Sequence, residues 1–360
     1  MSLGVTLVGH YPPPFGGVAT LLTQMESALQ SAGCRVEIFN LGHGRPDGAN
    51  VTSFDTSNRM REVLELRSAV AASDSDVFHY ISASYRSFWL GSVFATLTAM
   101  QGRRLVMSFV GGAFPDFIAT LSPVKRWWAR ATLSRAAALV ACNDEIAEVL
   151  GSFRVRPEIH RITNSFPMTG EGEPLPEDVE TFVERHSPVV STTGAAAPEY
   201  GLTGAVRAIS DVRERRPDVG FVMVLTRYGT DEHEAEIVRA IEEEDLESNV
   251  FVTRGLPDFT TLLGRSDVFL RSTLVDGDSM SVREALATGL PTVASDTAFR
   301  PEGVIEYRKG DVDDMASKLE HAFDRGTADA RLAREEGERN LEALLEVYRS
   351  VVDGATRGAA

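Results

Sequence analysis

The chain has 360 residues and a formal net charge of −16 at pH 7, and 43% of its residues are hydrophobic. This length is more typical of two domains than of one, and the acidic balance argues against broad binding to nucleic acid, whose phosphates attract basic surfaces. No apolar run reaches the roughly 18 residues that a membrane-spanning helix needs, and two cysteines, Cys34 and Cys142, are too few for a disulfide framework or a cysteine metal cluster.

Predicted strands and helices alternate through the first half of the chain. Residues 4–8 have strand character, and the apolar residues from Val18 to Leu29 recur with the spacing of one helix face. The same alternation predicts further strands at 35–39, 77–81, 105–109 and 138–141, and further helices at 61–72, 88–100, from about 125 and after 143. Repeated strand-then-helix units predict parallel strands with helices on both faces of the sheet.

An acidic, proline-rich stretch at 167–188 has the composition of a linker between domains. The alternation then restarts, with an acidic helix predicted over 231–247 and strands predicted at 188–192, 221–225, 250–253, 268–270, 291–294 and 304–307. An apolar stripe from Leu341 to Val352 predicts a closing helix. The sequence therefore predicts an α/β fold with two doubly wound Rossmann-like domains. Open sheets of this kind bind ligands at the carboxyl ends of their strands, so we expect the active site in a cleft between the domains.

Residues 270–296 form the most informative stretch of the sequence. A strand is predicted to end near Leu270, the following loop carries Asp276, and a helix opens shortly after it. Glu284 lies about one and a half turns into that helix, so the two carboxylates sit at different depths of one crevice and suit sugar or ribose hydroxyls. The helix start also offers a phosphate the positive end of the helix dipole and free backbone N–H groups. These groups belong to Ser279, Met280 and Ser281.

This stretch resembles the family 4 type of retaining glycosyltransferases, which have the GT-B fold of two Rossmann-like domains facing a cleft. The family hallmark is two acids separated by seven residues and followed by an Ala-small-Ala-x-Gly-x-Pro run; this chain has Asp276, Glu284 and the run 285–291. The likeness continues elsewhere in the chain. Residues 11–18 correspond to the family's glycine-rich first loop, 164–165 to the end of its first domain and 344–348 to its closing helix. It implies an acceptor-side domain at 1–168, a nucleotide-sugar-binding domain at 169–330 and a closing helix at 331–360.

The resemblance also implies roles for individual residues. Glu284 would hold the ribose of a nucleotide sugar, and Asp276 would face the transferred sugar. Gly16 and Gly17 would bring the backbone close to the donor phosphates, and Gly255 would lie near the base. The implied reaction moves a sugar from the nucleotide donor to an acceptor hydroxyl with retention of configuration. A donor phosphate oxygen takes the acceptor's proton, and no metal or other cofactor is needed.

The chain departs from the family pattern where the family carries positive charge. An arginine and a lysine that usually follow the first strand of the second domain are absent from the loop 194–201, and Val110 stands before Gly-Gly where the first domain commonly has a histidine. The developing charge of a leaving diphosphate must still be balanced. Three arginines that follow predicted strand ends suit bidentate phosphate binding, namely Arg227, Arg271 and Arg300.

We expect Arg271, helped by Arg300, to replace the missing pair of cations. Arg271 therefore joins Asp276 and Glu284 as an expected catalytic residue, whereas Arg300 and Gly194 join the expected donor-binding residues. For each arginine the alternative is an ordinary loop salt bridge in an acidic protein.

Positive charge is concentrated in residues 101–140, which hold six basic residues and one acid, Asp116. This window carries +5 and leaves −21 for the rest of the chain. Within it, 123–135 would form a short helix with cations and two tryptophans, a composition typical of a helix at a lipid interface. The acceptor would then be a lipid-linked sugar at an anionic cytoplasmic leaflet. The alternative is that Trp127 or Trp128 packs into the core and the arginines are ordinary surface.

Other functions stay open at this point. One is a related phosphorylase or epimerase, and another is a GT-B protein without transferase activity, a sugar- or partner-binding subunit that has lost the cations. The seven histidines show no spacing that suggests a metal site. The N-terminus lacks the features of a secretory signal, so we expect a cytoplasmic protein, at the inner face of the membrane if the 123–135 helix binds lipid.

Overall fold

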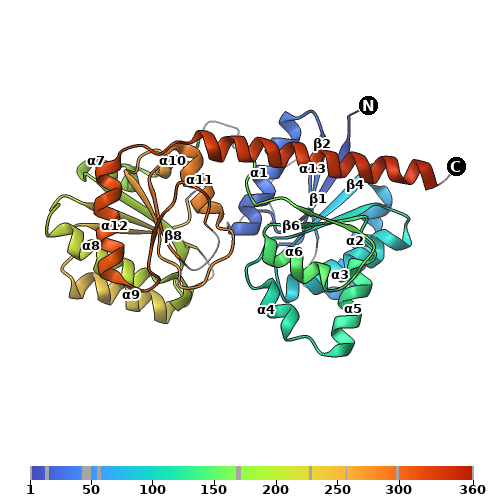
Figure 1. Ribbon diagram of the computed structural model, residues 1–360, viewed down its shortest axis with the longest axis horizontal. Coiled ribbons are helices and arrows are strands. Elements are labelled where there is room, and N and C mark those ends of the chain that lie inside the picture. Colours follow the sequence, from blue (N-terminus) through green and yellow to red (C-terminus); the bar gives the residue numbers. More distant parts are fainter. Residues whose placement is uncertain are drawn as a thin grey trace. The chain divides into compact units, whose positions relative to one another are not determined.

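A computed structural model describes residues 2–12, 16–42, 50–54, 58–167, 172–226, 229–256, 258–296 and 300–358. The chain forms two compact units: unit 1 comprises Met1–Thr169 and Glu336–Ala360, and unit 2 comprises Gly170–Glu335. Each unit is built on one parallel sheet with helices packed around it (Figure 1). The predicted α/β class is confirmed in both units.

In unit 1 the strands follow the order β3-β2-β1-β4-β5-β6-β7, and neighbouring strands are parallel. These strands are β1 (Gly4–Gly9), β2 (Arg35–Asn40), β3 (Val51–Ser53), β4 (Val77–Ser82), β5 (Leu105–Phe109), β6 (Ala138–Ala141) and β7 (Glu158–Arg161). β1 and β4 are buried along their whole length, as expected for strands covered on both faces. The sequence pattern does not predict β3 or β7, because both are short edge strands with exposed polar residues and no apolar run.

The helices of unit 1 bury their apolar faces around this sheet. α1 (Gly17–Ser31), for example, buries Leu22, Met25 and Leu29 at helical spacing. The other helices of the unit are α2 (Arg59–Ala72), α3 (Arg86–Met100), α4 (Phe114–Ala119), α5 (Pro123–Leu133), α6 (Asp144–Gly151) and, from Glu336 onward, α13 (Arg331–Gly358). Among the residues that the structure describes, no helix is both long enough and apolar enough to cross a membrane.

A buried chain of hydrogen bonds fixes α13 to the sheet of unit 1. His79 of β4 places its Nδ1 2.5 Å from the hydroxyl of Tyr348 on α13 and its Nε2 2.6 Å from the Oγ of Ser108 on β5. The His79 ring is fully buried, and burial lowers its pKa to about 3. The imidazole is therefore neutral at physiological pH and acts as a structural link between distant parts of the chain.

Replacing His79 with glutamine should flatten the pH dependence of the stability of unit 1. Folding lowers the pKa of His79 from 6.5 to about 3, so the stability from its neutral form is present above pH 6.5 and is lost as the pH falls. Between pH 6.5 and about pH 3, the free energy of unfolding should fall by about 1.4 kcal/mol per pH unit because of this group. Glutamine takes up no proton and can keep a hydrogen bond.

The measurement is a series of urea unfolding curves at pH values from neutral down to about 4.5. Tryptophan fluorescence monitors the unfolding. The fluorescence reports unit 1 alone, because the three tryptophans of the chain are Trp89, Trp127 and Trp128. Equal pH slopes for wild type and H79Q would contradict the assignment of the lowered pKa to His79.

In unit 2 the strands follow the order β10-β9-β8-β11-β12-β13 and are again parallel. They are β8 (Val189–Ala195), β9 (Gly220–Thr226), β10 (Val250–Arg254), β11 (Val268–Arg271), β12 (Thr292–Ser295) and β13 (Ile305–Tyr307). The helices are α7 (Glu177–Arg185), α8 (Leu202–Arg213), α9 (Asp231–Glu243), α10 (Phe259–Leu263), α11 (Met280–Thr288) and α12 (Val312–Arg325), with a 3₁₀ turn η1 (Pro198–Tyr200). The strand order reverses between β8 and β11, so the carboxyl ends of these two strands form a topological switch point, the usual ligand site of an open α/β sheet.

The linker predicted at 167–188 is wrong for its second half. α7 (Glu177–Arg185) belongs to unit 2 and buries Val179 and Val183 in an apolar cluster with residues of β9 and α10. Three acids in its first turn favour a helix start through the helix dipole. The same acids give the segment the composition of a linker, so its one apolar i, i+4 pair is too weak a pattern to predict a helix.

Candidate active site

A cluster of ion pairs lies at the switch point of unit 2. Arg271 is the last residue of β11, and its Nε and Nη2 donate to the two carboxylate oxygens of Asp276 at 3.0 and 3.1 Å. Its Nη1 donates to the carbonyl oxygen of Thr193 on β8 at 2.9 Å. Arg300 donates from Nη1 to Oδ2 of the same carboxylate at 3.0 Å. Three expected site residues that are separate in the sequence therefore meet beside β8 and β11.

This cluster is buried and carries a net positive charge. The side chains of Arg271, Asp276 and Arg300 are 12%, 9% and 1% exposed. Burial alone would raise the pKa of the Asp276 carboxyl, but Arg271 and then Arg300 outweigh burial and hold that pKa below its usual value. Burial likewise opposes the charge of Arg271, but Asp276 keeps the pKa of its guanidinium raised. Two guanidinium groups and one carboxylate leave one positive charge at the point where such sheets bind ligands.

Both oxygens of the Asp276 carboxylate accept hydrogen bonds within this cluster. Besides the arginines, the hydroxyl of Thr273 donates to Oδ2 at 3.0 Å and the N–H of Gly277 donates to Oδ1 at 3.0 Å. The resemblance suggests that Asp276 faces the transferred sugar, but in this geometry its oxygens bind arginines and its own loop. In this structure the carboxylate holds the two guanidinium groups in place.

Arg300 and Arg271 differ in what they offer a ligand. The Nε of Arg300 donates to the carbonyl oxygen of Ser295 at 2.9 Å, and its Nη2 donates to the Oγ of the same residue at 3.2 Å. Its side chain is almost fully enclosed, whereas that of Arg271 keeps some exposure. Arg271 is therefore more accessible to a ligand than Arg300.

The loop that follows β8 packs tightly against this cluster. A Cβ at Gly194 would lie 2.5 Å from the Tyr200 ring, and a Cβ at Gly201, whose φ is +61°, would collide with the carbonyl oxygen of Ser272. These two glycines let the Tyr200 ring reach a position 5.4 Å from the Arg271 guanidinium. Stacking of this kind fixes a guanidinium plane. Sequence reasoning missed Tyr200. An aromatic residue in a loop that begins and ends with glycine, here Gly194 and Gly201, could have indicated a ring packed closely against the backbone.

The helix start predicted near Ser279 is confirmed, since α11 begins at Met280 with Ser279 as its N-cap. Ser279 makes no side-chain cap bond, and its hydroxyl lies 3.1 Å from that of Ser281. The first N–H groups of a helix have no partner within the helix, so this start can accept an anion. Asp278 and Arg283 brace it with a 2.6 Å ion pair whose side chains are at most 4% exposed.

Glu284 and the remaining expected residues are spread over several elements. Glu284 lies within α11 and is 7% exposed. Gly255 has φ +67° and follows β10, and Gly16 and Gly17 open α1 in unit 1. Arg227 lies outside the described residues. In the part of the chain that the structure describes, no group of three or more histidine, cysteine or acidic side chains could hold a metal ion.

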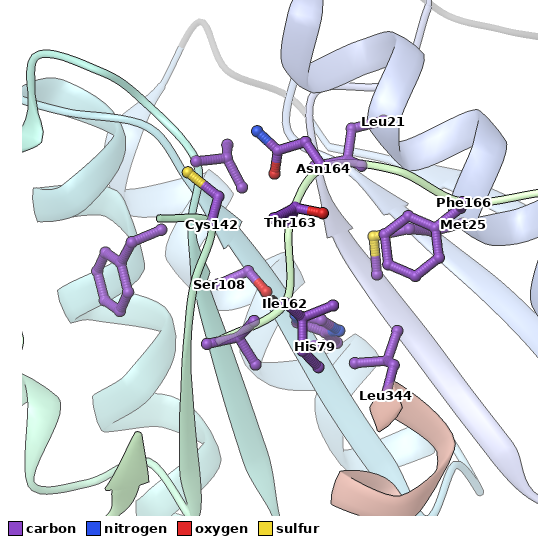
Figure 2. Close-up of a pocket in the computed structure, with 13 residues that line it drawn as sticks. Leu21, Met25, His79, Ser108, Cys142, Ile162, Thr163, Asn164, Phe166 and Leu344 are labelled. Carbon is purple, nitrogen blue, oxygen red and sulfur yellow. Dashed lines mark hydrogen bonds between the residues drawn. The ribbon is translucent and has the colours of Figure 1, made fainter. Parts of the chain in front are cut away.

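Unit 1 has a small pocket of its own, about 260 Å³ including space open to solvent. Figure 2 shows that its lining comes from several elements: Leu21 and Met25 from α1, Cys142 after β6, and Leu344 from α13. His79 and Ser108 form part of the lining and are already hydrogen-bonded to each other. Much of this volume is open to solvent, and the space enclosed by the lining is far too small to hold a nucleotide sugar.

Two family profiles match the chain. The profile described as Glycosyl transferases group 1 matches residues 178–336, and that described as Glycosyl transferase 4-like domain matches residues 16–165. The first match contains Arg271, Asp276 and Glu284, and the second begins at Gly16. No curated protein matches the chain by sequence.

Solved structures show the same fold at low sequence identity. Alr3699/HepE of Anabaena in complex with UDP-glucose has a TM-score of 0.70 at 15% identity, over 98% of this chain and 99% of that one. A glycosyltransferase from Rickettsia africae has 0.69 at 15%, over 98% and 99%. The α,α-trehalose 6-phosphate synthase of Burkholderia multivorans has 0.63 at 15%, over 100% of each chain. With matching profiles on both units and this shared GT-B fold, the chain belongs to the group 1 glycosyltransferases and is a glycosyltransferase enzyme.

Proposed function

We propose that this enzyme transfers a sugar from a nucleotide sugar to an acceptor hydroxyl with retention of configuration and without a metal. The observation that carries the proposal is the positively charged Arg271–Asp276–Arg300 cluster beside the open start of α11. A diphosphate is the part of a nucleotide sugar that needs both features. The structural neighbour Alr3699/HepE, which binds UDP-glucose, supports this donor class.

In the proposed reaction the bond between the anomeric carbon and the donor phosphate breaks through an oxocarbenium-like state, and the nucleotide diphosphate leaves with the electron pair. Arg271 stabilises the charge that develops on the diphosphate, and Arg300 acts through Asp276. A phosphate oxygen of the leaving group accepts the proton of the acceptor hydroxyl, whose oxygen bonds to the same face of the sugar. The N–H groups of Ser279, Met280 and Ser281 bind the diphosphate, and the acceptor is a glycan or lipid-linked sugar.

Glycines are proposed to shape the donor site. Gly194 makes room for Tyr200 and so orders the loop beside Arg271. Gly255 ends β10 with a positive φ and is proposed to lie near the base. Gly16 and Gly17 are proposed to bring the backbone at the start of α1 close to the donor phosphates.

The substitution Glu284→Gln tests the donor site directly. If Glu284 accepts hydrogen bonds from the ribose, the change replaces a charge-assisted bond with a neutral one and should weaken nucleotide binding by about 1–3 kcal/mol, or roughly 5–150-fold. Calorimetric titration with nucleoside diphosphates measures this loss. The matched control is Glu306→Gln, which changes an exposed acid on β13 and should leave binding unchanged. A folded E284Q protein with wild-type affinity would contradict the assignment.

A further inference from the structure

α5 (Pro123–Leu133) has two apolar faces. Ala129 and Leu133 on its inner face are completely buried. The outer face carries Val124, Trp127 and Trp128 at i, i+3 and i+4, and these side chains are 67%, 64% and 56% exposed. An amphipathic surface helix normally turns polar residues outward, so the outer face of α5 needs a partner that accepts large apolar groups.

Contacts on its inner side hold α5 in this orientation. The Thr132 hydroxyl lies 2.6 Å from that of Ser92 on α3, which runs beside α5 in unit 1 (Figure 1). Arg126 donates to the Ser152 Oγ at 2.9 Å, and its guanidinium lies 4.6 Å from the centre of the Phe153 ring. The exposure of the tryptophans is therefore built into a helix that is fixed on its opposite side.

Cations border the exposed face. Lys125 and Arg130 are exposed on α5, and α5 itself contains no acidic residue. They belong to the 101–140 window, which carries +5 in a chain of net charge −16. An anionic lipid surface attracts such a patch and repels the acidic remainder of the protein, so it selects this face of unit 1.

We propose that α5 docks unit 1 onto an anionic bilayer surface. The rings of Trp127 and Trp128 enter the headgroup region, where amphipathic aromatic side chains are most stable. Lys125 and Arg130 face the lipid phosphates. This surface is independent of the proposed transfer reaction, although it would bring a lipid-linked acceptor to the enzyme.

Vesicle binding tests the proposal with the full-length protein. Phosphatidylcholine vesicles are compared with vesicles that also contain phosphatidylglycerol, at low and high salt. Wild type should sediment with the anionic vesicles at low salt and be released by high salt, since the charge contribution is screened. In a Trp89→Phe background, Trp127 and Trp128 are the only tryptophans, and brominated lipids should quench them.

Two variants separate the apolar and charged contributions. Trp127→Ser with Trp128→Ser should lower the partition into anionic vesicles at least about tenfold, and Lys125→Ser with Arg130→Ser should weaken the salt dependence. Arg126 is kept, because it contacts Ser152 and Phe153. The matched control is Met60→Ser with Leu64→Ser, which removes two exposed apolar residues from α2 and should bind vesicles as wild type does.

Hydrogen exchange of peptides from unit 1 shows that each variant is folded around α5. Nucleotide affinity, measured on the same samples, keeps this test apart from that of the transfer reaction. Wild type left in the supernatant with anionic vesicles at low salt would overturn the proposal. So would a dimer that disappears in the double tryptophan variant without any vesicle binding, because α5 would then contact a second copy of the chain.

Discussion

Replacing Arg271 with alanine is expected to lower turnover about 100-fold or more while nucleotide affinity changes much less. The reason is that a cation placed beside the leaving diphosphate gains most when charge develops in the transition state. In this variant Asp276 still pairs with Arg300 at 3.0 Å, so the carboxylate keeps a partner and the fold should persist. The remaining cluster would be neutral and could no longer balance the leaving group.

The measurement is steady-state kinetics with a donor found by screening nucleotide sugars. Arg271→Lys should recover part of the turnover, because lysine keeps the charge but cannot make the bidentate contact with Asp276. Arg254→Ala is the matched control: Arg254 also ends a strand of the same sheet, but its partner is Glu234 and its side chain is 69% exposed. A loss of less than about threefold in R271A would leave Arg271 as a structural salt bridge.

The sequence predicts most elements of the fold because their apolar residues recur with a clear period. It fails where that signal is masked or weak, as in the acidic helix α7 and the polar edge strands β3 and β7. It also cannot decide the orientation of α5, since Trp127 and Trp128 are equally compatible with core and surface. The structure decides this, because Ala129 and Leu133 already fill the side that faces the core.

The candidate site shows the same limit of sequence reasoning. Arg271, Asp276 and Arg300 can each be selected from a position near a predicted strand end. Their assembly into one cluster depends on the neighbouring placement of β8, β11 and β12 in the sheet, which no local pattern contains. The pairing adds to the expected sugar-facing role of Asp276 an interpretation as the counterion of two arginines.

That interpretation gives the second large expected effect: Asp276→Asn should destabilise unit 2 by about 3–5 kcal/mol, the usual result of removing one partner from a buried ionic cluster. The substitution removes the carboxylate shared by two enclosed guanidinium groups and adds an amide donor that Arg271 cannot accept from. Hydrogen exchange of peptides that cover β11 and α11 measures the loss, since unit 2 contains no tryptophan.

A second substitution tests whether the loss comes from uncompensated charge. Adding Arg300→Met to Asp276→Asn removes one of the two cations, so the double variant should be more stable than D276N alone, and the double-mutant cycle should show strong coupling.

The pH dependence gives a further test. The pKa of Asp276 is lowered from 3.8, so its contribution to the free energy of unfolding is complete above that pH and is lost only as the pH falls below it. The difference between wild type and D276N should therefore be constant near neutral pH and shrink in acid. Equal protection of β11 and α11 in wild type and D276N at neutral pH would show that the arginines need no counterion, and that Asp276 is free to bind the sugar.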